Sequence, residues 1–192
     1  MTHREFTISD LHLGHQNILT FLQDGKPLRP FNSIEEMHQT IIDNWNKTVR
    51  PVDKVYVLGD VVINRKSMDI LASLTGKKCL VRGNHDIFKI EDYLKYFYEV
   101  QGVKVKTNYK MVMTHVPVHP DCLNRPTWRL NVHGHLHGNK IMKQENLPLY
   151  LRSAPAPDPK YLNVSCEQVN YTPKDLEQIY EENKTWLEQP LA

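Results

Sequence analysis

The sequence predicts a mixed α/β fold, and three observations support that class. Short, nearly all-apolar runs at residues 55–58 and 79–81 have the composition of strands that are buried on both faces. Helical patterns separate the early runs, and another helical pattern closes the chain. A polar cluster rich in Gly, Asp, Asn or His follows almost every apolar run. With 192 residues, we expect one domain spanning 1–192 that folds around its own core.

The elements can be assigned in chain order from their patterns. The expected strands comprise residues 4–8, 55–58, 79–81, 111–113, 130–132 and 161–164. The expected helices comprise residues 34–49, 67–74 and 89–97, and a last one that Thr172-Pro173 begins. The expected irregular segments are loops at 23–32, 116–127 and 139–160, and a hairpin at 97–105 around Gln101-Gly102. The helix at 34–49 has the clearest signal, because Ser33 and Glu36 form a capping box before its apolar stripe.

Composition excludes several classes of protein. The formal net charge is +2 and the chain has no run of five Lys or Arg residues, so it lacks the usual footprint of a nucleic-acid binder. Three widely spaced cysteines argue against a disulfide framework and fit a reducing compartment: Cys79, Cys122 and Cys166. No apolar stretch is long enough to span a membrane. We therefore expect a cytoplasmic protein without a membrane partner.

Polar clusters stand just past the ends of the apolar strands. The clusters are Asp10-Leu11-His12, Gly59-Asp60, Gly83-Asn84-His85-Asp86, His115, and Gly134-His135-Leu136-His137. In α/β sheets, ligands gather at the carboxyl ends of the strands. We therefore expect these clusters to converge in space, although they span most of the chain.

The residue types in these clusters favour a pair of metal ions. Asp10 and His12 are two residues apart, so extended backbone would point both side chains to one side, and the same applies to His135 and His137. Imidazole mixed with carboxylate suits Mn, Fe, Zn or Ni better than Ca or Mg. The carboxylate of Asp60 has two oxygens and can bridge two cations. Such a pair, about 3.5–4 Å apart, can bind both the attacking and the leaving oxygen at phosphorus.

The ordered set of clusters resembles the signature of the calcineurin-like metallophosphoesterases, and the resemblance covers residues 10–137. It implies a β-sandwich flanked by helices in a four-layer architecture. It also implies a metal ligand set: Asp10, His12 and His137 for one ion, Asn84, His115 and His135 for the other, and Asp60 bridging both. Manganese is the favoured metal, and Fe, Zn or Ni also suit these ligands. The resemblance gives His85 the role of protonating the leaving oxygen and Asp86 the role of orienting the imidazole of His85.

The function implied is hydrolysis of a phosphate ester by a metal-bridging hydroxide. We expect a small mono- or diester, with a nucleotide-type substrate favoured, because the chain has neither an additional domain nor a basic stripe. A nuclease and a non-catalytic, metal-stabilised binding module are the alternatives. Candidate substrate contacts are His15, Arg65 and Arg129. For His133 the resemblance implies no metal, and a hydrogen bond beside the site is the favoured role.

Overall fold

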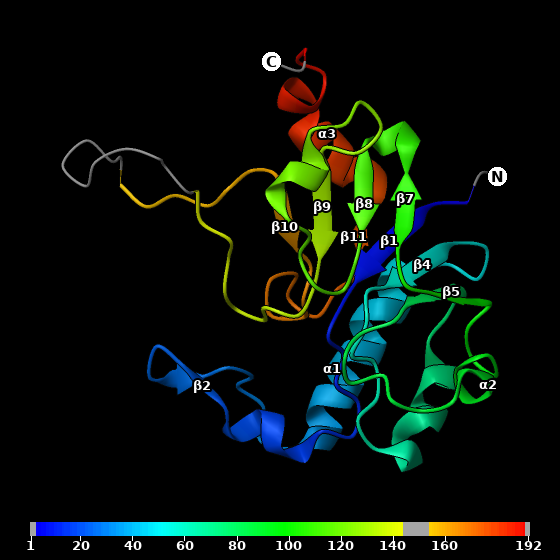
Figure 1. The fold of residues 1–192 in the computed structure, drawn as a ribbon. Coiled ribbons are helices and arrows are strands. Elements are labelled where there is room, and N and C mark those ends of the chain that lie inside the picture. Colours follow the sequence, from blue (N-terminus) through cyan, green and yellow to red (C-terminus); the bar gives the residue numbers. More distant parts are fainter. Residues whose placement is uncertain (1–2, 144–153, 191–192) are drawn as a thin grey trace.

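Two sheets form the centre of the fold in the computed structural model, which describes residues 3–143 and 154–190 (Figure 1). The first sheet has the order β11-β1-β4-β5-β6. Its strands are β1 (Glu5–Ile8), β4 (Lys54–Val57), β5 (Lys77–Val81), β6 (Glu99–Gln101) and β11 (Lys174–Asp175). The first four run parallel, and β11 pairs antiparallel with β1. The mixed α/β class predicted from the sequence is confirmed.

The second sheet has the order β10-β9-β8-β7. Its strands are β7 (Lys104–Lys106), β8 (Met111–Met113), β9 (Leu130–His133) and β10 (Tyr161–Asn163). The strands β8, β9 and β10 run parallel, and β7 pairs antiparallel with β8. The prediction of a hairpin at 97–105 was wrong, because β6 pairs with β5 and β7 pairs with β8. At this point the chain crosses from one sheet to the other.

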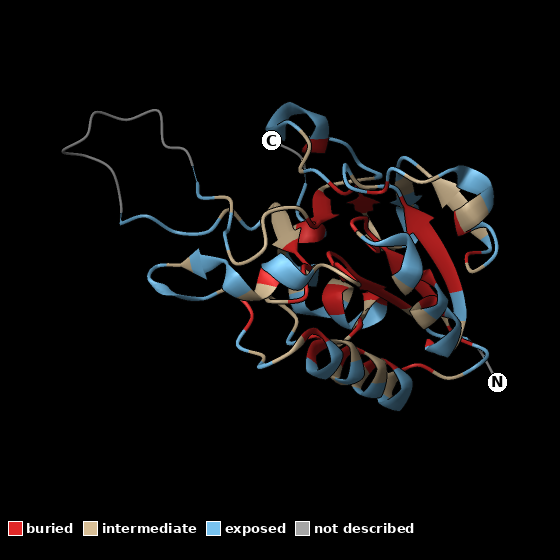
Figure 2. Cartoon of the chain, turned by 90° about the horizontal axis from the view of Figure 1, so that it is seen from below, coloured by how far each residue is buried: buried red, intermediate tan, exposed pale blue. Residues whose placement is uncertain are grey.

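Strand β4 shows why the sheets pack as they do. Val55 and Val57 face a core that the first sheet shares with α1, whereas Tyr56 and Leu58 face a second core. This second core also contains Met111, from β8 of the other sheet, and lies between the two sheets. Figure 2 shows these strands as the most buried part of the chain. The all-apolar composition of the strands is therefore explained by burial on both faces.

Helices border the sheets. The longer ones are α1 (Ile34–Thr48) and α3 (Leu176–Leu187), and the shorter ones are α2 (Ile90–Tyr93) and the 3₁₀ segments η1 (Gln16–Thr20), η2 (Arg65–Ser73), η3 (Thr107–Tyr109) and η4 (Pro120–Leu123). The capping prediction for α1 is confirmed, since the Ser33 hydroxyl accepts the Glu36 N–H at 3.1 Å. Helix α1 buries Met37, Ile41 and Trp45 against the first sheet.

Three expectations need correction. The helix predicted at 67–74 is the 3₁₀ segment η2. The segment 23–32 is not only a loop, because β2 (Leu22–Gln23) and β3 (Lys26–Pro27) pair as a small hairpin within it. Helix α3 starts from Asp175, whose carboxylate accepts the Glu177 N–H at 2.9 Å, and not from Thr172-Pro173. Among the described residues, no helix is long and apolar enough to cross a membrane.

The two sheets meet at the edge where their parallel strands end. Past β1 and β4, the Asp10 N–H donates to the Gly59 carbonyl at 3.0 Å. Past β8 and β9, the Gly134 N–H donates to the His115 carbonyl at 2.9 Å. The two pairs are joined because the His135 N–H donates to Asp10 Oδ2 at 2.9 Å. The loops that carry the polar clusters are thus hydrogen-bonded into one surface.

Candidate metal centre

Two groups of metal-binding side chains lie at this edge. One consists of Asp10, His12 and His137, and the other of Asp60, His115 and His135. Within each group the potential ligand atoms lie within 4.8 Å of one another. The convergence expected from the strand ends is therefore present, and His135 and His137 belong to different groups although only one residue separates them.

The first group contains buried polar atoms that a cation would satisfy. Asp10 Oδ1 and His12 Nε2 are buried and have no hydrogen-bond partner among the described residues. They lie 3.8 Å apart, and His137 Nε2 lies 4.0 Å from the same Asp10 oxygen. Leaving buried polar atoms unpaired costs free energy, on the order of 1–3 kcal/mol each. A divalent cation between these three atoms removes that cost, so the residues fit a metal.

Asp60 stands between the two groups. Its Oδ2 lies 3.7 Å from His12 Nε2 and 3.4 Å from His115 Nε2. Its other oxygen accepts the His85 N–H at 2.8 Å. One carboxylate oxygen therefore faces histidines of both groups, which is the position that a bridging ligand requires.

Asn84 completes the second group with an amide oxygen. Its Oδ1 lies 2.8 Å from His115 Nε2 and 3.0 Å from His135 Nδ1. The imidazole of His115 is fixed from behind, because its Nδ1 lies 2.8 Å from the Leu58 carbonyl and donates to it. Nε2 of His115 thus keeps its lone pair toward Asp60 and Asn84, as a metal ligand requires.

The backbone at the candidate ligands differs from the extended chain that the sequence argument assumed. The φ angle is 58° at Asp10, 50° at His12, 52° at Asp60, 69° at His135 and 49° at His137. Within the described residues these are five of the nine non-glycine positions with positive φ. Their side chains converge because the left-handed backbone turns the loops sharply, and not because of strand alternation. Such backbone is typical of functional sites.

Gly59 is tightly packed at this surface. Its φ is 86°, and an added Cβ would lie 2.6 Å from the Gly83 Cα and 2.6 Å from His115 Nδ1. Gly59→Ala is therefore expected to lower the free energy of unfolding by about 2–5 kcal/mol, from overpacking and left-handed backbone together. Urea unfolding of the metal-free protein measures the change. Gly102→Ala is the matched control, because nothing lies within 4 Å of its added Cβ. Equal effects of the two substitutions would contradict this reading.

The pKa shifts of Asp10, Asp60 and His12 favour cation binding. The pKa values of His115 and His137 are raised, because the carboxylates of Asp60 and Glu167 outweigh burial. Burial alone would raise the pKa of Asp10, but the nearby imidazole of His12 and the charge of His137 outweigh burial and leave this pKa below its ordinary value. The pKa of Asp60 is likewise lowered, since His115 outweighs the effect of burial. Burial lowers the pKa of His12. Charged carboxylates and a neutral imidazole are the forms that bind metal ions.

His85 and Asp86 lie beside the second group, but Asp86 does not have its expected contact. The Asp86 carboxylate is buried and accepts the N–H groups of Asp60, Val61 and Gly83 at 2.9, 3.0 and 2.8 Å. Both of its oxygens thus hold the loop backbone, and not the imidazole of His85 as the resemblance implied. His85 is exposed, and its ring centroid lies 5.9 Å from that of His12.

Two of the candidate substrate residues share a pocket, and the third lies elsewhere. His15 and Arg65 line a cavity of about 380 Å³ together with Phe88. His15 Nδ1 lies 3.3 Å from His12 Nδ1, so this cavity adjoins the first group. Burial and the neighbouring His12 together lower the pKa of His15 to about 4. Arg129 instead donates to the Leu187 carbonyl at the end of α3, at 2.9 Å.

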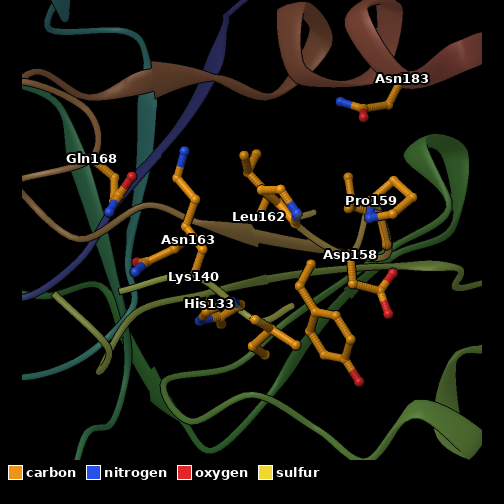
Figure 3. Close-up of a pocket in the computed structure, with 12 residues that line it drawn as sticks. His133, Lys140, Asp158, Pro159, Leu162, Asn163, Gln168 and Asn183 are labelled. Carbon is orange, nitrogen blue, oxygen red and sulfur yellow. The ribbon is translucent and has the colours of Figure 1, made fainter. Parts of the chain in front are cut away.

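His133 lies behind the metal centre and belongs to neither group. Its Nδ1 donates to the Gly134 carbonyl at 2.8 Å, and its ring lies edge-on to that of Tyr161. Figure 3 shows His133 in the wall of a separate pocket with Asn163 and Gln168. Both of these amides donate to the His137 carbonyl, at 2.8 and 3.2 Å. The pocket thus supports the loop that carries a candidate ligand, in line with the expected indirect role of His133.

The sequence argument missed Arg29 and Glu167. Arg29 Nε lies 2.6 Å from Glu167 Oε1, and the same carboxylate oxygen lies 3.0 Å from His137 Nδ1. Glu167 follows strand β10, just as the other clusters follow their strands, so the strand-end rule applied to this strand would have included it. Arg29 lies between prolines in a loop, where no local pattern distinguishes it from a solvated arginine.

The sequence is similar to a known protein family and to individual known proteins. A family model described as the calcineurin-like phosphoesterase superfamily domain matches residues 6–153. An uncharacterized protein of Methanocaldococcus jannaschii is 35% identical over 178 residues, which cover 91% of this chain and 88% of that protein. The Gene 66 protein of Mycobacterium phage L5 is 30% identical over 91 residues, 45% of this chain and 41% of that protein.

A solved structure has a similar fold. The crystal structure of a protein of unknown function from Aquifex aeolicus matches with a TM-score of 0.68 and 24% identity. The match covers 94% of this chain and 100% of that chain. The similarity therefore extends over both sheets and over the edge at which they meet.

Proposed function

The chain belongs to the calcineurin-like phosphoesterase superfamily, and on that premise we propose that it hydrolyses phosphate esters with the help of two divalent cations. The observation that carries the proposal is the position of Asp60, whose Oδ2 faces His12 of one group and His115 of the other. A purely structural metal site has no need of a carboxylate shared between two cation positions. Two-metal phosphoesterases do need one, because the cations must act on the same phosphoryl group.

Each cation has a defined set of protein ligands in this proposal. Asp10, His12 and His137 hold one ion, and Asn84, His115 and His135 hold the other, with Asp60 shared. Bound there, the ions would lower the pKa of a water molecule and offset the charge that develops on the phosphoryl oxygens. The mixed imidazole and carboxylate set supports manganese as the metal, with Fe, Zn or Ni as substitutes.

His85 is proposed to donate the proton that the leaving oxygen needs. Two contacts support this role: the backbone N–H of His85 donates to Asp60 Oδ1 at 2.8 Å, and the centroid of its exposed ring lies 5.9 Å from that of the His12 ring. Histidine is the side chain whose ordinary pKa suits proton transfer at neutral pH. Asp86 supports this arrangement indirectly, because its carboxylate accepts the N–H groups of Asp60 and Gly83 and so joins the two loops.

We propose a small phosphate ester, of the nucleotide type, as the substrate. The cavity beside His15 supports this choice, because it adjoins the first group and has room for a leaving group. The Arg65 guanidinium lies 4.8 Å from the centroid of the Phe88 ring in its wall. Aromatic and guanidinium planes stack with flat rings, and a guanidinium also pairs with phosphate.

Hydrolysis in the presence of Mn²⁺ tests the proposal. Purified protein with added Mn²⁺ is expected to release phosphate or alcohol from a panel of nucleotides, cyclic nucleotides and chromogenic mono- and diesters. Chelation should abolish the activity, and renewed Mn²⁺ should restore it, because the cations supply the activated water. No turnover of any ester by metal-loaded protein would leave the binding-module alternative in place.

The same panel of substrates distinguishes a nuclease from an enzyme that hydrolyses small phosphate esters. Single-stranded DNA enters the panel as one substrate, assayed at increasing salt. A nuclease that binds many phosphates loses affinity steeply with salt, whereas hydrolysis of a mononucleotide changes little. We expect the small esters to be the better substrates, because the chain has a net charge of only +2.

A further inference from the structure

A buried ion pair stands directly behind the first metal position. Arg29 is completely buried, and its guanidinium donates to the Asp10 carbonyl at 2.5 Å, to the Leu11 carbonyl at 3.1 Å and to Glu167 Oε1 at 2.6 Å. We propose that Glu167, fixed by Arg29, is the positioning residue of His137 and selectively strengthens cation binding at the site formed by Asp10, His12 and His137. This inference rests on the proposed function.

The first step of the argument concerns the tautomer of His137. Its Nδ1 lies 3.0 Å from Glu167 Oε1. An ionised carboxylate only accepts hydrogen bonds, so Nδ1 carries the proton and Nε2 keeps its lone pair. Nε2 is the atom that lies 4.0 Å from Asp10 Oδ1. Glu167 therefore turns the free nitrogen of His137 toward the cation position and makes it more basic.

The second step concerns what fixes Glu167 itself. A lone carboxylate that is 7% exposed would be costly to keep ionised. The guanidinium of Arg29 offsets that cost with a charge-assisted hydrogen bond. Because the same guanidinium also holds the carbonyls of Asp10 and Leu11, it ties the turn after β10 to the loop that carries Asp10 and His12. Three ligands of one site are thus positioned by one ion pair.

Among the residues that the structure describes, the second site has no such carboxylate behind its imidazoles. His115 Nδ1 donates to the neutral carbonyl of Leu58, and His135 turns its Nδ1 toward Asn84 rather than away from the site. A hydrogen bond to an ionised acceptor is roughly twice as strong as one to a neutral acceptor. The effect of Glu167 should therefore be confined to the first site, and this selectivity distinguishes positioning from general stabilisation.

The experiment is a Mn²⁺ titration of the metal-free protein by calorimetry, with wild type, Glu167→Gln and Glu5→Gln compared. Glutamine keeps the shape of Glu167 but not its charge. At one of the two sites, the dissociation constant of Mn²⁺ is expected to be about 10–100-fold higher in Glu167→Gln than in wild type. At the other site it should be unchanged. Glu5→Gln is the matched control, because Glu5 also forms an ion pair of 2.6 Å, with Lys106, at the opposite end of β1, although the side chains of Glu5 and Lys106 are 13% and 16% exposed.

A double substitution identifies the affected site. His137→Gln should weaken the same site, and Glu167→Gln combined with it should cause no further loss, because the carboxylate acts through that imidazole. A merely structural role would instead give additive losses and would lower the unfolding midpoint of the metal-free protein in step. If Glu167→Gln folds poorly, Glu167→Asp, which keeps the charge, is titrated in its place and should retain more first-site affinity than His137→Gln.

The outcomes separate this inference from the proposed function. Wild-type protein that binds no Mn²⁺ overturns both. Wild-type protein that binds two ions, together with a Glu167→Gln variant that binds both with unchanged affinity or loses affinity equally at both sites, overturns the positioning role alone. Selective loss at the site that His137→Gln also weakens supports it.

Discussion

Asp60→Asn is expected to weaken both cation sites at once and to lower phosphoesterase activity by more than about 100-fold. Substitution of residues that only orient metal ligands costs roughly 10–100-fold, and Asp60 is proposed as a ligand of both ions. The substitution turns an oxygen that faces His12 and His115, at 3.7 and 3.4 Å, into a neutral amide atom. The amide oxygen can still accept the His85 N–H, so the loop backbone keeps its contact.

Metal analysis of the dialysed protein, together with the activity assay, measures the effect of Asp60→Asn. Asp175→Asn is the control, because Asp175 caps α3 and asparagine caps helices equally well. The unfolding midpoint of metal-free Asp60→Asn is measured beside that of the control, because the lowered pKa of Asp60 means that its charge stabilises the folded protein. A variant that keeps one ion at the wild-type affinity would show that Asp60 belongs to a single site.

His85→Asn is expected to reduce kcat by about 10²–10⁴-fold while both cations stay bound. The side chain of His85 is exposed and belongs to neither group of candidate ligands, and the contact with Asp60 is made by the backbone N–H of His85. Loss of the imidazole therefore removes a proton donor without disturbing a ligand. Steady-state kinetics and metal analysis of the same preparation measure the two properties together.

The leaving group decides whether the loss in His85→Asn reflects proton donation. A nitrophenolate needs no proton when it departs, so the deficit should shrink for nitrophenyl esters and be greatest for alkyl or nucleoside esters. His119→Asn is the control, since His119 is an exposed histidine at the start of η4. A deficit of the same size for every leaving group would assign His85 to phosphate binding rather than to acid catalysis.

The sequence predicted correctly that the site residues converge, but it did not predict their backbone conformation. The rule that polar residues gather at strand ends placed Asp10, Asp60 and His115 together, because parallel strands end at a common edge. The alternation argument for Asp10 and His12 was wrong, since both residues have left-handed backbone. Alternation applies only within a strand, and these residues follow β1.

Long-range partners were beyond the sequence. The segment around Gln101-Gly102 looks like a hairpin because turn residues separate two short strands, but turn composition does not say which strand pairs with which. The contact between Arg29 and Glu167 joins residues 138 positions apart, and the sequence around each of them does not indicate that they pair. Asp86 is next to His85 in the chain, yet its carboxylate accepts the backbone N–H groups of Asp60 and Val61.

The left-handed backbone at the five candidate ligands narrows the range of side chains that evolution can sample there. Asp, Asn and His tolerate positive φ better than most residues, and β-branched residues tolerate it least. These same three side chains offer the oxygen and nitrogen atoms that bind transition metals. Backbone conformation and coordination chemistry thus favour the same few residue types at Asp10, His12 and Asp60. A related protein that no longer binds cations would therefore still be expected to have Asn, Asp or Gly at these positions, because the backbone conformation excludes most other side chains.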